Sequence, residues 1–377
     1  MVYYFYLSIF FMLAVWFLYP IVLFLTSRIS DSFYSYGYNV VPVSVIIAAH
    51  NEEDNLKKRC ENIFSQDYEA DIEIIIVSDG SNDSTVSVIQ ELKSQFNNVV
   101  FIDVQPQGGR SNAHNMAVQL ATHEILIFTD AETVFENGCI AKLVEPFSNV
   151  DVGFVSGTLK YINQNINTIS ESIGLYWKFE MFLRRAESKL GLYATGTGAC
   201  CAVRKSLYEI IPATGDVDFI TPLDVVLKGK KCIHTDDAIA WDELPDSPKK
   251  EFLARVRMTS KNIHGTITRW GFSMIFKKPV YSLTLFFHKI GRWLTPFWLM
   301  SLFISNLFLL ADSWFYFAIF LLQILFYSLG FLGYLGVRFI FSAQIYSFLL
   351  ANIGFFFGVL KAMFGKVPYA YKPVNKL

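Results

Sequence analysis

The stretch "EILIFTDAETVFENG" (residues 124–138) joins an apolar run to a pair of acids. Residues 125–129 have the composition of a buried strand, and Asp130 and Glu132 follow directly, with one alanine between them. Side chains alternate along an extended chain, so both carboxylates point to the same side. Two carboxylates at this range repel each other unless a cation or a shared proton relieves them. Because Mg²⁺ prefers oxygen ligands, the stretch predicts a metal site at a strand end and not two solvated acids in a loop.

The segments around this stretch alternate between strand and helix patterns. Apolar runs predict strands at 43–49, 72–78, 99–103 and 125–129, and the segments between them predict helices at 51–66, about 85–95 and 111–121. Such alternation is typical of an α/β domain with a mostly parallel sheet covered on both faces. Ligands bind beyond the carboxyl ends of these strands. We therefore expect Glu52, Asp79, Asp130 and Glu132 to share one crevice.

The chain from residue 150 to residue 265 is less regular. It predicts a strand near 152–160, a helix near 171–189, a strand near 232–240 and a helix from Ser247. Two further segments in this region are "GTGACCAVRKS" (196–206) and "VDFITPLDVVLKG" (217–229).

Both ends of the chain contain long uncharged runs. One extends from Met1 to Ser27, and three more cover 293–311, 313–337 and 339–360. About 20 apolar residues cross a bilayer as a helix, so the lengths predict one N-terminal and about three C-terminal transmembrane helices in preference to buried core helices. No basic residue precedes the first run, and Arg28 follows it. This pattern favours a retained anchor over a cleaved signal peptide. It also favours a cytoplasmic location for the middle domain.

These patterns predict five parts of the chain. They are an N-terminal anchor (1–27), a cytoplasmic α/β domain (41–265), an amphipathic segment at the membrane interface (266–292), C-terminal transmembrane helices (293–361) and a basic tail (362–377).

Composition argues against several other classes of protein. The net charge is −1, so there is no electrostatic case for nucleic-acid binding. The five cysteines form no CxxC pair, which favours reduced thiols over disulfides or a zinc site. Transporters place functional charges inside their spans, and the four uncharged runs contain none.

Several motifs together resemble those of the family 2 glycosyltransferases. They are "PVSVIIAAHNEE" (42–53), "IIIVSDGSNDST" (74–85), "QGGRSNAHNMAV" (107–118) and "IFTDAET" (127–133), within a likeness from about Val41 to Gly265. The resemblance implies a GT-A fold, a nucleotide-sugar donor and inversion of the anomeric centre. With its flanking membrane runs, the chain further resembles the members that build exopolysaccharides, such as the chitin, cellulose and hyaluronan synthases.

The resemblance also implies a role for particular residues. The nucleotide would contact Ala48, Glu52, Asp79, Gly109, Arg110 and Asp130. The metal, Mg²⁺ or Mn²⁺, and the diphosphate would lie at Asp130 and Glu132, where Glu takes the place of the family's second Asp.

The acceptor side and the catalytic base are implied in the same way. Gly196, Thr197 and Gly198 of "GTGACC" resemble the loop that lines the acceptor side. Asp218 takes the position of the catalytic base, although Val217 replaces the usual preceding acid, and Asp216 and Asp224 are the alternatives.

The segment "ARVRM" (254–258) lies where processive members carry Gln-x-x-Arg-Trp. Arg257 matches, but Ala254 and Met258 replace the Gln and the Trp, which weakens a prediction of processive polymerisation. Arg255 and Arg257 could stabilise phosphate charge, or they could form a solvated basic face near the membrane.

The sequence thus predicts a multi-pass enzyme of the plasma (inner) membrane that moves a sugar, expected from a UDP-sugar, to a growing glycan or a lipid-linked saccharide. General base catalysis by Asp218 and Lewis-acid assistance by the metal suit this chemistry. Membrane lipid, and export or polymerisation proteins, are further expected partners. The alternatives are a polyprenyl-phosphate glycosyltransferase and a non-catalytic component of a glycan secretion complex.

Overall fold

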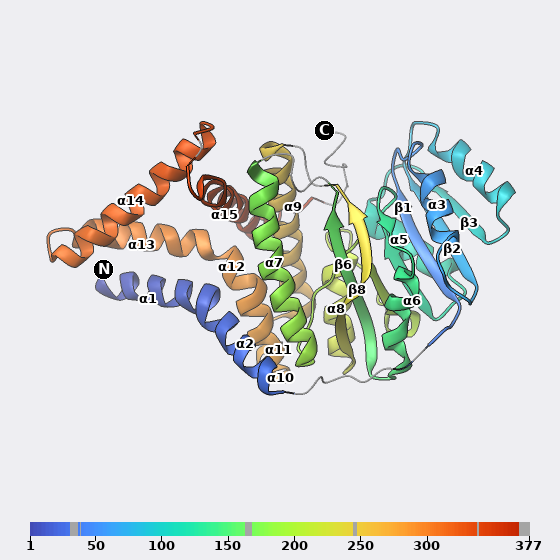
Figure 1. Ribbon diagram of the computed structural model, residues 1–377, viewed down its shortest axis with the longest axis horizontal. Coiled ribbons are helices and arrows are strands. Elements are labelled where there is room, and N and C mark those ends of the chain that lie inside the picture. The colour runs from blue at the N-terminus through green and yellow to red at the C-terminus, as the bar shows by residue number, and fades with distance from the viewer. Residues whose placement is uncertain (31–36, 38, 163–167, 244–246, 338, 369–377) are drawn as a thin grey trace.

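The structure is a computed structural model and describes residues 1–30, 37, 39–162, 168–243, 247–337 and 339–368. A mixed β-sheet flanked by helices occupies one end of the molecule, and the most apolar helices extend from the other end (Figure 1). Helices α7 (Thr168–Lys189) and α9 (Pro248–Gly265) lie between these two parts.

The sheet has eight strands in the order β3-β2-β1-β4-β7-β6-β8-β5. Their bounds are β1 (Val43–Ala49), β2 (Ile72–Asp79), β3 (Val99–Val104), β4 (Ile125–Thr129), β5 (Val134–Phe135), β6 (Val152–Tyr161), β7 (Cys201–Arg204) and β8 (Lys231–Asp242). The first four strands in the order are parallel, and Val43 pairs with both Ile72 and Ile125. Strand β7 is antiparallel to both of its neighbours, and β8 is parallel to β6. The prediction of a mostly parallel sheet is confirmed.

Apolar side chains on both faces explain why the central strands are buried. Val45 and Ile47 of β1 belong to one core, together with side chains of α3 (Leu56–Phe64), α4 (Thr85–Gln95) and α6 (Cys139–Val144). Ile46 points to the opposite core, which is covered by α5 (Arg110–Leu120) and α8 (Val217–Leu227). Because successive side chains alternate, a strand in the middle of this sandwich buries both faces and is apolar at most of its positions.

Most predicted elements agree with the structure to within a few residues, but the first helix starts late. Residues 51–66 were predicted to be helical, whereas α3 begins at Leu56. Asn51 has a left-handed φ of 58°, and its side-chain oxygen accepts the backbone N–H of Asn82 at 2.9 Å. This bond, to a residue 31 positions further along the chain, holds Asn51 in a non-helical conformation, and Glu52 lies in a loop.

Three of the helices in the described part of the chain are long and apolar enough to cross a membrane. The first is continuous from Val2 to Ile29 through α1 (Val2–Leu13), a π-helical turn (Ala14–Leu18) and α2 (Tyr19–Ile29). The others are α14 (Trp314–Tyr334) and α15 (Ser342–Met363). The expectation of about three C-terminal spans is corrected to two, because α13 (Thr295–Leu309) has 15 residues and about 20 are needed.

The segment 266–292 does not form one amphipathic helix. It is a succession of η4 (Thr266–Trp270), α10 (Met274–Lys277), α11 (Pro279–Leu285), η5 (Phe286–Ile290) and α12 (Gly291–Trp293). Gly271, at a φ of 65°, ends the first of these turns. Lys289 and Arg292 point inward to Glu180, so only part of the basic content faces outward. The location of the segment at a membrane interface stays a prediction.

Helix α15 packs closely against α9, which carries part of the site described below. A Cβ atom on Gly358 would come within 2.6 Å of the Cβ of Thr259, and one on Gly354 within 2.8 Å of the Cβ of Arg255. The two glycines therefore allow a close approach between a candidate membrane helix and the α/β domain.

Candidate active site

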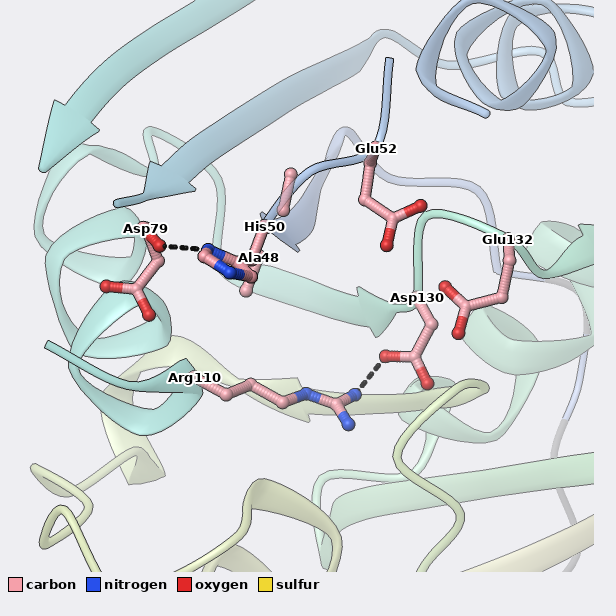
Figure 2. Close-up of a pocket in the computed structure, with 8 residues that line it drawn as sticks. Ala48, His50, Glu52, Asp79, Arg110, Asp130 and Glu132 are labelled. Carbon is pink, nitrogen blue, oxygen red and sulfur yellow. Dashed lines mark hydrogen bonds and ion pairs between the residues drawn. The ribbon is translucent and has the colours of Figure 1, made fainter. Parts of the chain in front are cut away.

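The crevice expected at the ends of the parallel strands is present. A small cavity there is lined by Ala48, Ala49, His50, Glu52, Asp79, Arg110, Asp130 and Glu132. These residues come from the ends of β1, β2 and β4 and from the start of α5, so the topology of the sheet assembles them (Figure 2).

Asp79 organises the glycine turn that precedes α5. Its side chain is 3% exposed, and its two carboxylate oxygens accept the backbone N–H groups of Gly108 at 2.7 Å and Gly109 at 2.9 Å. Gly109 has a φ of 92°, which a residue with a Cβ rarely adopts. The turn places Arg110 at the mouth of the cavity. Contact of Asp79 with a nucleoside stays a prediction.

Asp130 and Glu132 lie next to each other after β4, with their carboxylates facing the same space (Figure 2). The Arg110 guanidinium donates to Asp130 and forms an ion pair with it. Burial, and then the charge of Asp130, raise the pKa of Glu132 to about 8. Glu52, 7% exposed, extends toward the same space and accepts a hydrogen bond from Asn55 at 2.7 Å. The carboxyl groups of Glu52, Asp130 and Glu132 therefore line one small space.

A second, larger cavity of about 290 Å³ adjoins the first and shares Arg110 and Asp130 with it. Asp218, in the first turn of α8, lines this cavity. Burial, and then the nearby Asp216, raise the pKa of Asp218 to about 6, while Arg110 opposes the shift. Asp216 also lines the cavity, but its carboxylate is paired with Lys261 at 2.9 Å. The role of Asp218 as a general base stays a prediction.

The loop formed by Gly196, Thr197 and Gly198 lines the second cavity, next to Asp218. A Cβ on Gly196 would lie 2.8 Å from the Phe154 ring and 2.9 Å from the backbone oxygen of Asp218. A Cβ on Gly198 would lie 3.5 Å from the carboxyl carbon of Asp218 and 3.4 Å from Arg110. The first glycine is thus required by packing, and the second leaves space between a base and a cation.

Only one of the two predicted arginines of α9 reaches this cavity. Arg257 lines it, together with Met258 and Lys261. Arg255 pairs with Glu251 at 2.6 Å and packs toward α15, so it is outside the cavity lining. The difference follows from the helical geometry, because residues two positions apart face different sides of a helix.

Asp242, at the end of β8, lines the second cavity and was missed by the sequence analysis. Burial, and then Asp130, raise the pKa of Asp242 to about 6. An acid at the end of a predicted apolar strand was the available signal, as it was for Asp130. The alternative base Asp224 is 4% exposed and lies 3.5 Å from Arg269, away from the residues that line the cavity.

Arg59 of α3 is a second residue that the sequence did not reveal. It is 2% exposed, donates to Thr129 at 2.7 Å, and lies over the Phe135 ring at 4.0 Å. Burial lowers its pKa to about 10, and the charge of Asp130 is among the effects that oppose the shift. Thr129 in turn donates to the backbone oxygen of Ala199 at 2.9 Å. A buried cation thus joins the end of β4 to the loop that lines the second cavity.

Comparison with known proteins identifies the domain. Residues 44–211 match the sequence profile of glycosyl transferase family 2. The chain is 27% identical over 263 residues to a poly-beta-1,6-N-acetyl-D-glucosamine synthase of Staphylococcus epidermidis, covering 66% of this chain and 61% of the relative. It is 26% identical over 254 residues to the synthase of the same name from Staphylococcus aureus strain MSSA476, covering 64% and 60%. The chain therefore matches about three fifths of the length of these relatives.

The fold is also found in a solved structure. A mannosyltransferase from Pyrobaculum calidifontis, in complex with GDP-Man and Mn²⁺, aligns over 95% of this chain and 98% of its own, with a TM-score of 0.70 and 18% sequence identity. At this identity the likeness establishes the fold, which is GT-A-like with helices that could span a membrane. Residues 44–211, within the α/β domain, match glycosyl transferase family 2.

Proposed function

We propose that the chain is a membrane-anchored, inverting glycosyltransferase that transfers a sugar from a nucleotide sugar to a growing glycan. The observation that carries the proposal is the junction of two cavities at Arg110 and Asp130. The first cavity would hold the nucleotide diphosphate at the strand ends. The second, with Asp218 on its wall, would hold the transferred sugar and the acceptor.

The residues at this junction fit a divalent cation. In the described parts of the chain, no group of three or more His, Cys, Asp or Glu side chains has the spacing of a metal site. Mg²⁺ and Mn²⁺ need fewer protein ligands than that, because phosphate oxygens and waters complete their coordination. Asp130 and Glu132 would hold the ion. Burial, and then the charge of Asp130, raise the pKa of Glu132, and a bound cation would oppose both effects by stabilising the ionised carboxylate. When bound, the ion supplies Lewis-acid stabilisation of the diphosphate leaving group.

Asp218 would act as the general base on the acceptor hydroxyl. Inversion requires attack from the side opposite the leaving group, as in inverting glycosidases. Asp218 and Asp130 both line the second cavity, so the acceptor and the leaving group would meet between them. Base catalysis typically contributes about 10²–10⁴-fold in rate. Arg257 and Lys261 would place positive charge beside the departing phosphate.

The names of the relatives direct the choice of substrate. They are poly-beta-1,6-N-acetyl-D-glucosamine synthases, so UDP-N-acetylglucosamine is the proposed donor and a β-linked glycan chain the proposed acceptor. We place the catalytic domain on the cytoplasmic side of the plasma membrane, because Arg28 follows the first span and none of the preceding residues is basic. Membrane lipid and glycan-export proteins are the proposed partners.

The test is donor turnover by the full-length protein purified in detergent. UDP-N-acetylglucosamine, UDP-glucose and GDP-mannose would be supplied in turn with Mn²⁺, and nucleotide release measured. We expect release from the first donor, loss in Asp130→Ala and after chelation, and no effect of Asp151→Ala, because Asp151 is an exposed residue that pairs with Lys230 and does not line either cavity. Release that is unchanged in Asp130→Ala would contradict the proposed site. A lipid-extractable product would replace the glycan acceptor with a lipid phosphate.

A further inference from the structure

Behind the second cavity, one buried carboxylate gathers several cations. Glu180 of α7 is 2% exposed and accepts hydrogen bonds from Arg184 at 3.0 Å, Lys289 at 2.6 Å and Arg292 at 2.9 Å. Its oxygen Oε1 is also 3.2 Å from Nε2 of His288. Burial alone would raise the pKa of Glu180, but Lys289 and then Arg292 hold it well below its ordinary value. The carboxylate is therefore ionised and fixes the side chains around it.

Two of these cations also line the cavity proposed to bind the acceptor. Arg184 and Lys289 both face that space while they contact Glu180. Removing one member of a buried ion pair leaves the other charge uncompensated, which costs far more than the loss of an exposed pair. The shape of this cavity wall therefore depends on Glu180.

Arg184 connects this cluster to the loop next to Asp218. Its Nη1 donates to the side-chain hydroxyl of Thr197 at 2.7 Å. Thr197 is the only residue from Gly196 to Ala199 whose side chain can form a hydrogen bond. A glycine-rich loop has many accessible backbone conformations, so this bond restricts the loop where its backbone faces the base.

The same cluster reaches the N-terminal membrane helix. Nδ1 of His288 lies 2.8 Å from Glu187, and the other oxygen of Glu187 accepts the hydroxyl of Tyr19 at 2.6 Å. Tyr19 belongs to α2, within the continuous helix Val2–Ile29. The contacts thus run without interruption through Thr197, Arg184, Glu180, His288, Glu187 and Tyr19.

We propose that Arg184 is a positioning residue for the acceptor, which holds the Thr197 loop in place against Asp218 and is itself anchored by Glu180 to the membrane-side helices. The proposal rests on the proposed function for the nature of the acceptor. It assigns no chemical step to Arg184. It predicts that removing the hydrogen bond between Arg184 and Thr197 increases the mobility of the loop and leaves nucleotide binding unchanged.

The contact can be removed with little change in volume. Thr197→Val replaces the hydroxyl group with a methyl group, whereas Thr197→Ser keeps the hydroxyl group. Arg184→Met removes the guanidinium that donates the hydrogen bond. Arg185→Met is the matched control, because Arg185 is the next residue of α7 and pairs with Asp236 on the surface. For each full-length variant, two quantities are measured: backbone hydrogen exchange of residues 195–199, and the KM for a β-1,6-linked N-acetylglucosamine oligosaccharide. Calorimetric binding of UDP with Mn²⁺ reports on the nucleotide site.

A hydrogen bond to a charged group contributes enough to change these quantities by about 10-fold or more. We expect that increase in loop exchange and in acceptor KM for Thr197→Val and Arg184→Met, a smaller increase for Thr197→Ser than for Thr197→Val, wild-type values for Arg185→Met, and unchanged UDP binding in all four. Equal exchange in Arg184→Met and Arg185→Met would overturn the proposal, as would a fast-exchanging loop with an unchanged KM. If the wild type transfers no sugar, the proposed function fails, and the exchange measurements still decide whether Arg184 positions the loop.

Discussion

Substitution by alanine should have different effects at two glycines of one loop. We expect Gly196→Ala to lower stability and Gly198→Ala to lower activity. In Gly196→Ala, the new Cβ would lie 2.9 Å from the backbone oxygen of Asp218 and 2.8 Å from the ring of Phe154. A backbone atom cannot rotate away as a side chain can, so the loop or the start of α8 has to move. Overpacking of this kind costs about 1–3 kcal/mol. For a domain of roughly 200 residues, each kcal/mol lowers the melting temperature by about 2–4 °C.

In Gly198→Ala, the new Cβ would contact Arg110 at 3.4 Å and the Asp218 carboxyl carbon at 3.5 Å, which are ordinary van der Waals separations. The fold should therefore keep its melting temperature, while the methyl group occupies the space where an acceptor hydroxyl would approach the base. We expect turnover to fall and UDP binding to persist.

The assay pairs thermal unfolding in detergent with donor turnover for both variants. Gly196→Ala should lose stability, and Gly198→Ala should lose activity alone. If Gly198→Ala were fully active, the loop would not face the reacting groups, and the assignment of the second cavity to the acceptor would be wrong. A wild-type melting temperature for Gly196→Ala would show that the packing against Asp218 is not as described.

Three further predictions concern the base, the arginines and the helix contact. Asp218 can accept a proton only when it is ionised, and its pKa is about 6. Turnover at saturating Mn²⁺ should therefore be constant above that pH and fall about tenfold by pH 5. In Asp218→Asn, the residual turnover should not follow this pH profile. Arg257→Ala should reduce turnover about 10-fold or more. Arg255→Ala should leave turnover nearly unchanged, since Arg255 is outside the cavity. Equal losses of steady-state turnover in the two variants would refute the assignment of Arg257 to the cavity. Gly358→Leu should lower the melting temperature by forcing α15 away from α9, and an unchanged value would argue against their close packing.

The parallel half of the sheet could be predicted from the sequence because each of its strands carries its own signal. Residues 125–129 were predicted as a strand, and β4 has the same bounds. A continuous apolar run is sufficient where both faces of a strand are buried, and the rule for parallel sheets then places Asp79 and Asp130 at one edge. Neither inference needs information about distant contacts.

The residues that the sequence did not reveal are those whose environment is set by tertiary contacts. Arg59 lies in a helix next to Lys58 and Glu61, a pattern typical of a solvated surface, yet Thr129 and Phe135 enclose it. Lys289 belongs to a segment whose composition resembles that of an interfacial helix, but its side chain points inward and donates a hydrogen bond to the buried Glu180. Local periodicity reports the average surroundings of a segment and not the single partner of a charged side chain.

The acids and the cations of the site also come from different parts of the fold. The acids come from strand ends and from the start of α8, and they include Asp130 and Asp218. Most of the cations come from helices on the membrane side, with Arg257 on α9 and Lys289 on η5. Because α9 packs against α15, the separation between the acids and these cations depends on how the membrane helices are seated. We therefore expect the detached α/β domain (41–265) to retain the acids proposed to bind a nucleotide and metal, together with Arg257, and to lose Lys289 and the packing of α15 against α9.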